Sequence, residues 1–461
     1  MEKIPLDSLQ PETIAPVDFL SPKGDILITK GSKISDFHIS LLKRRHVKLL
    51  YINKPSDELK NLLSYNVDAV QTLEKEFSID DYSAELDDLE DIQNLDSSIK
   101  NNAPGQKGLQ EILSSKFVEK AEKKIKDFSS FPVKPEGEAL ERNIKEVGVT
   151  QRTVDYKKAI YQEYEDALLQ TIKIYSAFAD KKSVPAPYIG HIIENFVDTF
   201  ITDKNILLNL ANIRPKEDYL FNHALNVSLL SINIAASAGY NHRQVVEIGM
   251  CSLLQDVGMM LIPRQIRFNK ERLSKDEFYE IQKHPVIGMH ILETITGLPD
   301  SVPYASYLHH EREKGTGYPK QRHSRFIHNF TKITSIADVY EALISPRAWR
   351  KPYLPYQGIE MVLKLVREGF FNGEYVKSLI DYTSLFPVGS LVRLNSGEIA
   401  KVVKANKSSY TKPVVSILMN NQSEMLKEEK IRLVDLLQTN GLSILEPVDN
   451  ENLQVDLMKG F

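Results

Sequence analysis

The segment Tyr307–Pro319 reads YLHHEREKGTGYP, and it places two adjacent histidines directly before a glycine-containing turn. Imidazole nitrogens are common ligands of transition metals. Neighbouring side chains on a regular helix point about 100° apart, so His309 and His310 can face one centre only near a helix end or with two metals present. The glycines that follow predict such an end, and the segment is therefore a candidate metal site.

Two acidic residues elsewhere in the chain are also candidate metal ligands. Asp256 follows Gln255 at the end of the apolar run GMCSLLQDVGMML, and Asp338 lies on the apolar face of ITSIADVYEALI. A buried carboxylate needs an arginine, a helix N-terminus or a metal ion as its partner. Taken alone, each acid, like His223 within its amphipathic helix, is explained by an ordinary structural contact. Taken together they indicate a cation shared between helices, as in metal-binding helical bundles.

The chain of 461 residues is long enough for two or three domains of about 100–200 residues. Residues 1–64 are expected to form a small α/β module, with strands at 25–31 and 47–52 around a helix at 35–45. Residues 65–150 are an acidic linker and helical connector, and the acidic run is either a solvated surface or a docking surface for a basic partner. Residues 151–385 have helical periodicity throughout, and residues 386–461 alternate as in a small β-domain. The predicted fold is multidomain, with a central all-α bundle between two small modules.

Composition argues against several classes of protein. A formal net charge of −4 and a sequence pI of about 6.3 argue against a strongly basic nucleic-acid-binding protein. No apolar run approaches the roughly 18 residues of a membrane span. Cys251 is the only cysteine, which favours a reducing, cytoplasmic setting. Imidazole and carboxylate ligands without thiolate suit iron, manganese, zinc or nickel.

The order and surroundings of these residues resemble the HD-GYP family, a branch of the HD superfamily of metal-dependent phosphohydrolases. His309–Pro319 is close to the family signature HHE[RK]xDGxGYP. YLFNHALNV contains His223 where the family has its first metal histidine, and KHPVIG contains His284. LLQDVGM stands where the family has His-Asp-x-Gly-Lys, and ITSIADVYEALISPRAWR resembles its final acid-bearing helix. The resemblance covers the whole helical domain and implies an HD-type bundle.

The resemblance also implies a bacterial signalling protein that acts on cyclic di-GMP with one or two divalent ions of iron, manganese or another transition metal. The implied metal ligands are His223, Gln255, Asp256, His284, His309, His310 and Asp338, and Asp256 is the catalytic residue that bridges the metals and a hydroxide. Such a hydroxide attacks the phosphodiester, giving the linear dinucleotide and then GMP. The implied substrate-binding residues are Arg312, Gly317, Tyr318, Pro319, Arg347 and Arg350, through close backbone approach, guanine stacking and phosphate pairing.

The sequence departs from the family pattern at three positions. Gln255 replaces the histidine of the His-Asp pair, Met259 replaces the following lysine, and Lys314 replaces the aspartate of the signature loop. Tyr219 stands four residues before His223, where some members carry a glutamate that supports a third metal. A neutral amide is a weak ligand, and methionine offers no charge to a phosphate. We therefore expect one metal to bind well and the other weakly or not at all, without a trinuclear centre.

These departures leave two main interpretations. The first is a receptor: the domain binds cyclic di-GMP, or a protein partner through its flanking modules, with impaired or absent phosphodiesterase activity. The alternative is an active though slow metal-dependent cyclic di-GMP phosphodiesterase. Hydrolysis of another nucleotide is a third, which the Gly-Tyr-Pro loop disfavours. The long amphipathic segment Tyr156–Lys181 suggests a homodimer.

Overall fold

The computed structural model describes short strands within residues 2–52 and most of the chain from residue 104 onward. The described residues beyond 52 are 104–128, 134–144, 154–203, 219–269, 271, 273–347, 350–406 and 409–449. The chain divides into two compact units, Met1–Leu89 and Glu90–Phe461. Each unit is considered by itself.

The first unit contains short antiparallel strands. They are β1 (Glu2–Pro5), β2 (Thr13–Ile14), β3 (Phe19–Leu20), β4 (Ile26–Ile28), β5 (Lys33–Ile34) and β6 (Leu49–Ile52). One sheet has the order β1-β6-β3-β4, and β2 pairs with β5. β4 and β6 fall within the two strands expected from the sequence. The helix expected at 35–45 and the acidic run lie outside the described residues, so the α/β character of this module stays a prediction.

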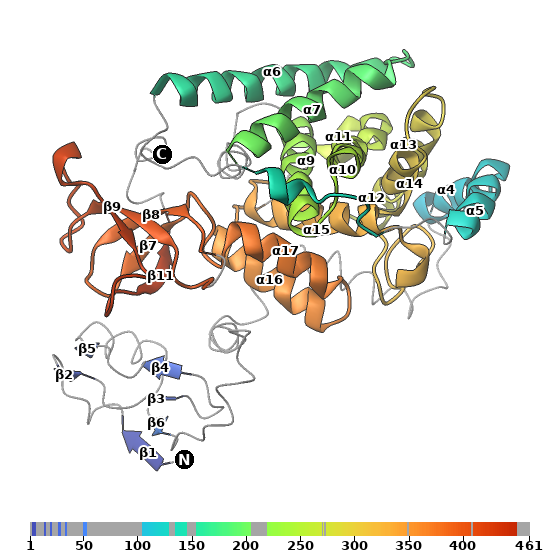
Figure 1. The fold of residues 1–461 in the computed structure, drawn as a ribbon. Coiled ribbons are helices and arrows are strands. Elements are labelled where there is room, and N and C mark those ends of the chain that lie inside the picture. The colour runs from blue at the N-terminus through green and yellow to red at the C-terminus, as the bar shows by residue number, and fades with distance from the viewer. Residues whose placement is uncertain are drawn as a thin grey trace. The chain divides into compact units, whose positions relative to one another are not determined.

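The second unit is mostly helical and ends in a β-sheet (Figure 1). Its helices are α4 (Pro104–Leu113), α5 (Lys116–Phe128), α6 (Val154–Ala179), α7 (Ala186–Thr202), α9 (Tyr219–Ser237), α10 (His242–Leu254), α11 (Arg264–Arg267), α12 (Lys275–Ile281), α13 (His284–Leu292), α14 (Ser301–Leu308), α15 (Asn329–Ile344), α16 (Pro355–Arg367) and α17 (Gly373–Thr383). The 3-10 helices among the described residues are η5 (Leu140–Asn143), η7 (Val257–Leu261), η8 (Ser324–Phe326) and η9 (Glu428–Lys430). None of the described helices has the length and apolarity that a bilayer crossing requires.

Helix α9 is the centre of the bundle. Every side chain from Leu220 to Ala236 is buried, because α6, α10, α15 and α17 pack around it. A helix buried on all sides is apolar all round, and its few polar residues must find partners inside the protein. His223 and Asn226 are such residues, one turn apart on α9.

Local signals fix where the surrounding helices begin. Asn241 caps α10, and the capping box of Ser274 and Glu277, which the sequence predicts, starts α12. The side chain of His328 accepts the backbone N–H of Phe330 at the start of α15. These caps determine the register in which α10 and α15 present their polar residues to α9.

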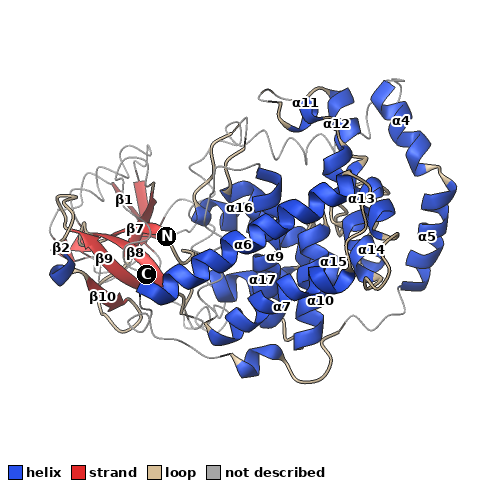
Figure 2. Cartoon of the chain, turned by 90° about the horizontal axis from the view of Figure 1, so that it is seen from above, coloured by secondary structure: helices blue, strands red, loops and turns tan. Residues whose placement is uncertain are grey.

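The C-terminal sheet is antiparallel, with the strand order β10-β9-β8-β7-β11. Its strands are β7 (Leu391–Leu394), β8 (Ile399–Lys404), β9 (Val414–Met419), β10 (Arg432–Asp435) and β11 (Ile444–Val448). The small β-domain expected from the sequence is therefore confirmed. Strands β8 and β9 are buried along nearly their whole length. Figure 2 shows this sheet in red beside the blue helices of the same unit.

Candidate metal centre

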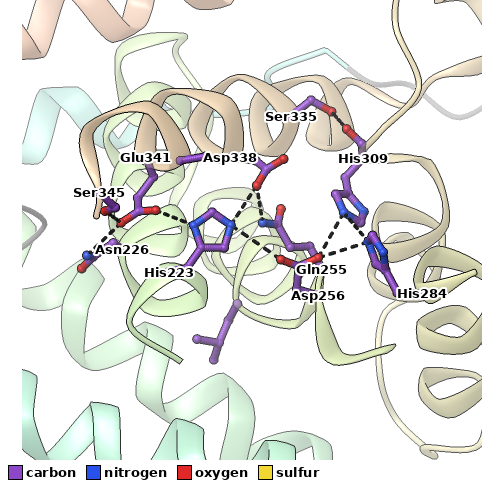
Figure 3. A network of polar contacts seen from close by, with 12 residues as sticks. His223, Asn226, Gln255, Asp256, His284, His309, Ser335, Asp338, Glu341 and Ser345 are labelled. Carbon is purple, nitrogen blue, oxygen red and sulfur yellow. Dashed lines mark hydrogen bonds and ion pairs between the residues drawn. The ribbon is translucent and has the colours of Figure 1, made fainter. Parts of the chain in front are cut away.

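The implied metal ligands meet at one buried place between the helices (Figure 3). They are His223 from α9, Gln255 and Asp256 from the junction of α10 and η7, His284 from α13, His309 and His310 from the end of α14, and Asp338 from α15. Their ligand atoms form two groups, each within 4.8 Å. The histidine set is Asp256, His284, His309 and His310, and the aspartate set is His223, Asp256 and Asp338.

The histidine set is organised as a metal site. His284 Nδ1 lies 2.7 Å from the carbonyl oxygen of Ile281, and His309 Nδ1 lies 2.8 Å from that of Ser306. Each Nδ1 therefore carries a proton, which it donates to the backbone, and each Nε2 is left to face the other at 3.3 Å. Two lone pairs at this distance repel each other unless a cation lies between them. The donor set thus fits a divalent ion.

The charge states in the histidine set also suit a cation. Burial opposes ionisation of Asp256, but contacts with the imidazoles of His284 and His309, whose Nε2 atoms lie 3.2 and 3.4 Å from Oδ1, hold its pKa well below the ordinary value. Burial, together with the neighbouring His309 and His284, lowers the pKa of His310 well below its ordinary value. A carboxylate and a neutral imidazole are the forms that bind metals.

The position of His309 and His310 confirms the helix end expected from the sequence. His309 is the residue directly after α14, and His310 follows in the turn. The hydroxyl of Ser335 on α15 donates to the carbonyl of His309 at 2.6 Å. The ring of Tyr318 stacks on that of His310, with centroids 4.4 Å apart and planes 20° apart. These contacts keep both imidazoles turned toward Asp256.

The aspartate set makes hydrogen bonds within the protein, while the neighbouring Gln255 Oε1 is buried without a partner among the described residues. Asp338 Oδ1 accepts a hydrogen bond from Gln255 Nε2 at 3.1 Å and lies 2.9 Å from His223 Nε2. His223 Nδ1 forms a short contact with Glu341 Oε2. Burial acts to lower the pKa of His223, but Glu341 and the hydrogen bonds to Asp338 and Glu341 raise it to about 10. An ion bound here through His223 Nε2 would therefore have to displace a proton.

Glycine at position 258 brings the two sets close together. A Cβ on Gly258 would lie 2.0 Å from the carbonyl oxygen of His284 and 2.6 Å from the amide nitrogen of Gly288. Only glycine permits η7 and α13 to approach this closely. Ser306 supports the same junction by donating its hydroxyl to the carbonyl of Gln255 at 2.7 Å.

Glu311 closes the loop that follows the histidines. Its carboxylate accepts the backbone N–H groups of Lys320 and Arg322, each at 2.7 Å. Burial raises the pKa of Glu311 to about 7, against the lowering effect of these two hydrogen bonds. The carboxylate thus joins the beginning and the end of the loop that contains Gly-Tyr-Pro.

The loop residues expected to bind substrate make contacts within the protein. Gly317 is needed because a Cβ there would lie 2.3 Å from the carbonyl oxygen of His310, so its close approach is to the chain's own backbone. Arg312 is buried, and its Nη1 donates to the carbonyls of His309 and Glu311. Tyr318 supports His310, and Pro319 is half-buried beside it. Their predicted roles toward a nucleotide remain predictions.

The two arginines expected to bind phosphate lie just beyond α15. The guanidinium of Arg350 donates to the carbonyls of Ala342 and Leu343 at the end of that helix. The guanidinium of Arg347 lies 5.0 Å from the centroid of the Tyr219 ring, and its charge opposes protonation of His223. Arg347 is therefore the one that adds positive charge near the aspartate set.

Known protein families match the helical part of the chain and its C-terminal sheet separately. Residues 205–371 match the family model of the HD domain, and residues 391–456 match a KOW domain associated with the HD domain. The chain is 25% identical over 285 residues to the cyclic di-GMP phosphodiesterase PA4108 of Pseudomonas aeruginosa, covering 61% of this chain and 68% of that relative. It is 28% identical over 244 residues to the cyclic di-GMP phosphodiesterase PdeB of Borreliella burgdorferi, covering 52% and 62%. A 3′3′-cGAMP-specific phosphodiesterase 2 of Vibrio cholerae is 28% identical over 268 residues, covering 55% and 51%.

This chain contains an HD domain of the HD-GYP type. The matches span about half to two thirds of these relatives' own length. The resemblance seen in the sequence is thus confirmed for the family, while the activity of the whole chain is a separate question.

The HD domain accommodates its three departures in different ways. Gln255 takes part in the hydrogen bonding of the aspartate set, as described above. Met259 is buried in η7 as an apolar residue. The ammonium of Lys314 lies 3.5 Å from the centroid of the Phe370 ring, so this residue is held by a cation–π contact within the protein.

Sequence analysis missed several residues that orient the ligands of the HD domain. Glu341 holds His223, and Asn226 Nδ2 donates to Glu341 Oε1 at 3.3 Å. Tyr164 on α6 donates to Asn226 Oδ1 at 3.0 Å, which extends the network beyond the HD match. The spacing of Asp338 and Glu341, three apart on one helix face, is a signal that would have found Glu341. Nothing local in the sequence marks Asn226 or Tyr164.

Proposed function

We propose that the HD domain binds cyclic di-GMP with one divalent ion in the histidine set and hydrolyses it slowly or not at all. The observation that carries this proposal is the hydrogen bond from Gln255 Nε2 to Asp338 Oδ1. At this position the chain presents an amide N–H, a hydrogen-bond donor, instead of an imidazole lone pair. The change affects the aspartate set and leaves the histidine set intact.

The position of a proton in the aspartate set supports this proposal. With Gln255 donating to Asp338, and His223 held between Asp338 and Glu341, a proton takes the place of a cation in the aspartate set. An ion entering there must displace that proton and break both hydrogen bonds, and it gains only a weak amide oxygen from Gln255 in return. Loss of a residue that supports a metal ligand typically costs about 10–100-fold in affinity or activity, and loss of a ligand costs at least as much.

The histidine set, Asp256 and Arg347 would have different roles toward a bound phosphodiester. A divalent ion held by the histidine set supplies Lewis acidity toward a phosphoryl oxygen. Asp256 stays ionised and belongs to both sets, so it is the residue that would hold the ion and orient an attacking water. Arg347 adds positive charge beside the aspartate set, where it is available to pair with a phosphodiester.

A second candidate is the active, slow phosphodiesterase. The ligand atoms of His223, Asp256 and Asp338 lie within 4.8 Å of one another, which is close enough for a common ion if His223 gives up its proton. Relatives of the HD domain bear phosphodiesterase names for cyclic di-GMP and for 3′3′-cGAMP. This candidate predicts turnover of one of these nucleotides.

One experiment separates the two candidates. The purified full chain is incubated anaerobically with Fe(II) or Mn(II) and with cyclic di-GMP or 3′3′-cGAMP, and nucleotides are resolved by chromatography over hours. An Asp256→Ala variant serves as the control. Intact nucleotide that co-elutes with the wild-type chain supports the receptor, whereas linear dinucleotide or GMP that is absent from the control supports the enzyme. Intact nucleotide without binding contradicts both.

Three further expectations belong to this proposal. A cytoplasmic location, pairing of two chains through the long helix α6, and a protein partner for the flanking modules all stay predictions. Each is tested independently of the site, for example by light scattering of the full chain.

A further inference from the structure

Helix α5 lies outside the HD match, yet it packs directly against the helices that carry the metal-binding histidines. Its buried residues Val118, Ala121 and Ile125 join one apolar cluster with side chains of α13 and α14. Both views show α4 and α5 beside α13 and α14 (Figures 1 and 2). In the chain, α4 and α5 come between the strands of the N-terminal unit and the HD domain.

A single carboxylate on α5 contacts both ends of the segment that holds the histidines and the Gly-Tyr-Pro loop. Glu122 accepts a hydrogen bond from the hydroxyl of Tyr307 at 2.7 Å. The same side chain forms an ion pair with Arg322. Tyr307 lies two residues before His309, and Arg322 lies three residues after Pro319. Glu122 therefore bridges the start and the end of the segment.

Arg322 is contacted by two carboxylates, one from α5 and one from the loop itself. Glu311 holds the backbone N–H of Arg322 at 2.7 Å, while Glu122 pairs with its guanidinium. Tyr307 is fully buried, and the side chain of Arg322 is only 9% exposed. Charge-assisted hydrogen bonds at such partly buried positions are stronger than exposed ones. The loop is thus fixed by one carboxylate of its own and by one from α5.

A further contact extends this arrangement toward α4. The ammonium of Lys320 donates to the carbonyl of Leu113, the last residue of α4, at 3.0 Å. α4 also packs against α12, which precedes the metal ligand His284. The connector thus contacts the loop at two places and the neighbouring helix at a third.

We propose that helix α5 is a clamp that sets the conformation of the Gly-Tyr-Pro loop, with Glu122 as its positioning residue. Release of the Glu122 contacts would free the guanidinium of Arg322 and leave Glu311 as the carboxylate that still holds the backbone there. The seating of α5 then controls nucleotide binding more than metal binding, because the ligands of the histidine set are fixed separately through Ile281, Ser306 and Ser335. The nucleotide part of this inference rests on the proposed function.

The test compares Glu122→Gln with Glu119→Gln in the full chain. Glu119 is on the same helix and exposed, so it is the matched control. Backbone hydrogen exchange is measured for residues 309–322 in the Mn(II)-loaded, nucleotide-free protein, and then the affinities for Mn(II) and for cyclic di-GMP are measured. For Glu122→Gln we expect about tenfold faster exchange in this segment and about tenfold weaker nucleotide binding, with Mn(II) affinity changed by less than about threefold. Glu119→Gln is expected to leave all three unchanged.

A double-mutant cycle separates positioning from general stability. If the contact acts through Arg322, then Glu122→Gln combined with Arg322→Gln exchanges no faster than either single variant. Exchange at 309–322 equal to the wild type in Glu122→Gln overturns the clamp. So does exchange that rises evenly across the helical domain, because that is the signature of lost overall stability. If the wild-type chain binds no cyclic di-GMP, the proposed function fails, and the exchange measurement still decides the clamp.

Discussion

Gln255 and Asp338 are joined by a hydrogen bond of 3.1 Å in which the amide donates to the carboxylate. The same oxygen, Oδ1, lies 2.9 Å from His223 Nε2. One atom that would serve as a metal ligand is therefore engaged by two neighbours on α9 and at the end of α10. These two contacts of Asp338 are the basis of the proposal that a divalent ion binds in the histidine set alone.

Restoring a histidine at position 255 is expected to restore the second ion. Gln255→His supplies an imidazole lone pair beside Asp338 and removes the amide donor. We expect metal-dependent hydrolysis of cyclic di-GMP to rise by about 10–100-fold over the wild type, the range associated with restored support of a metal site. The rate is measured by anaerobic chromatography of nucleotides. Gln255→Asn, which keeps an amide, is the control, and equal rates in the two variants would contradict this role of Gln255.

Removal of a ligand from the histidine set is expected to abolish tight metal binding. His284→Ala leaves His309 Nε2 and Asp256 without the third partner of the site. Mn(II) affinity should fall by at least about tenfold, as measured by calorimetry, with an unchanged circular dichroism spectrum. His242→Ala changes an exposed histidine of α10 and should bind as the wild type. A site that tolerates His284→Ala would not be the one described.

The junction between η7 and α13 is expected to tolerate no side chain at position 258. In Gly258→Ala the new methyl would lie 2.0 Å from the carbonyl oxygen of His284, which is backbone and not easily moved. Overpacking of this kind costs about 1–3 kcal/mol of unfolding free energy, and here it also displaces a metal ligand. Urea denaturation measures the loss. Gly369→Ala, where an added Cβ meets no atom within 4 Å although φ is +80°, separates backbone strain from crowding.

Acid is expected to destabilise the start of α15 through His328. Burial, followed by the charge of Lys332, lowers the pKa of His328 to about 4 from the ordinary 6.5. Above pH 6.5 both the folded and unfolded states are neutral there. As the pH falls below 6.5 the unfolded chain binds a proton that the folded chain does not, so stability is lost down to about pH 4. The total loss from this residue approaches about 3 kcal/mol.

The variant His328→Asn isolates that contribution. Asparagine keeps a side-chain acceptor for the N–H of Phe330 and cannot be protonated in this range. The unfolding free energy of the variant, measured by urea denaturation between pH 4 and pH 7, should fall less steeply than that of the wild type. Parallel curves would show that His328 does not titrate in this way.

The sequence predicted several of the residues that the structure brings together, because these stand inside a local pattern. His309 and His310 precede a glycine turn, and Asp256 and Asp338 interrupt apolar runs, so burial with a partner was a physical expectation. Even the end of α14 at the histidines followed from the angle between neighbours on a helix. The capping box at Ser274 was visible for the same reason.

The supporting contacts were hidden because they depend on packing between distant segments. Glu122 contacts Tyr307 and Arg322 across about 200 residues of chain, and no local pattern marks it. The role of Gly317 also could not be read, since its close contact is with the backbone at His310, which only the folded loop reveals. Gln255 was recognised as a changed residue, but the direction of its amide required the structure.

The number of divalent ions bound per chain tests the central claim most directly. The 461-residue chain is loaded anaerobically with Mn(II), freed of loosely bound ions, and measured by native mass spectrometry. The account predicts one ion per chain, lost in His284→Ala. Two tightly bound ions in the wild-type chain would contradict it, because the aspartate set would then bind metal despite Gln255.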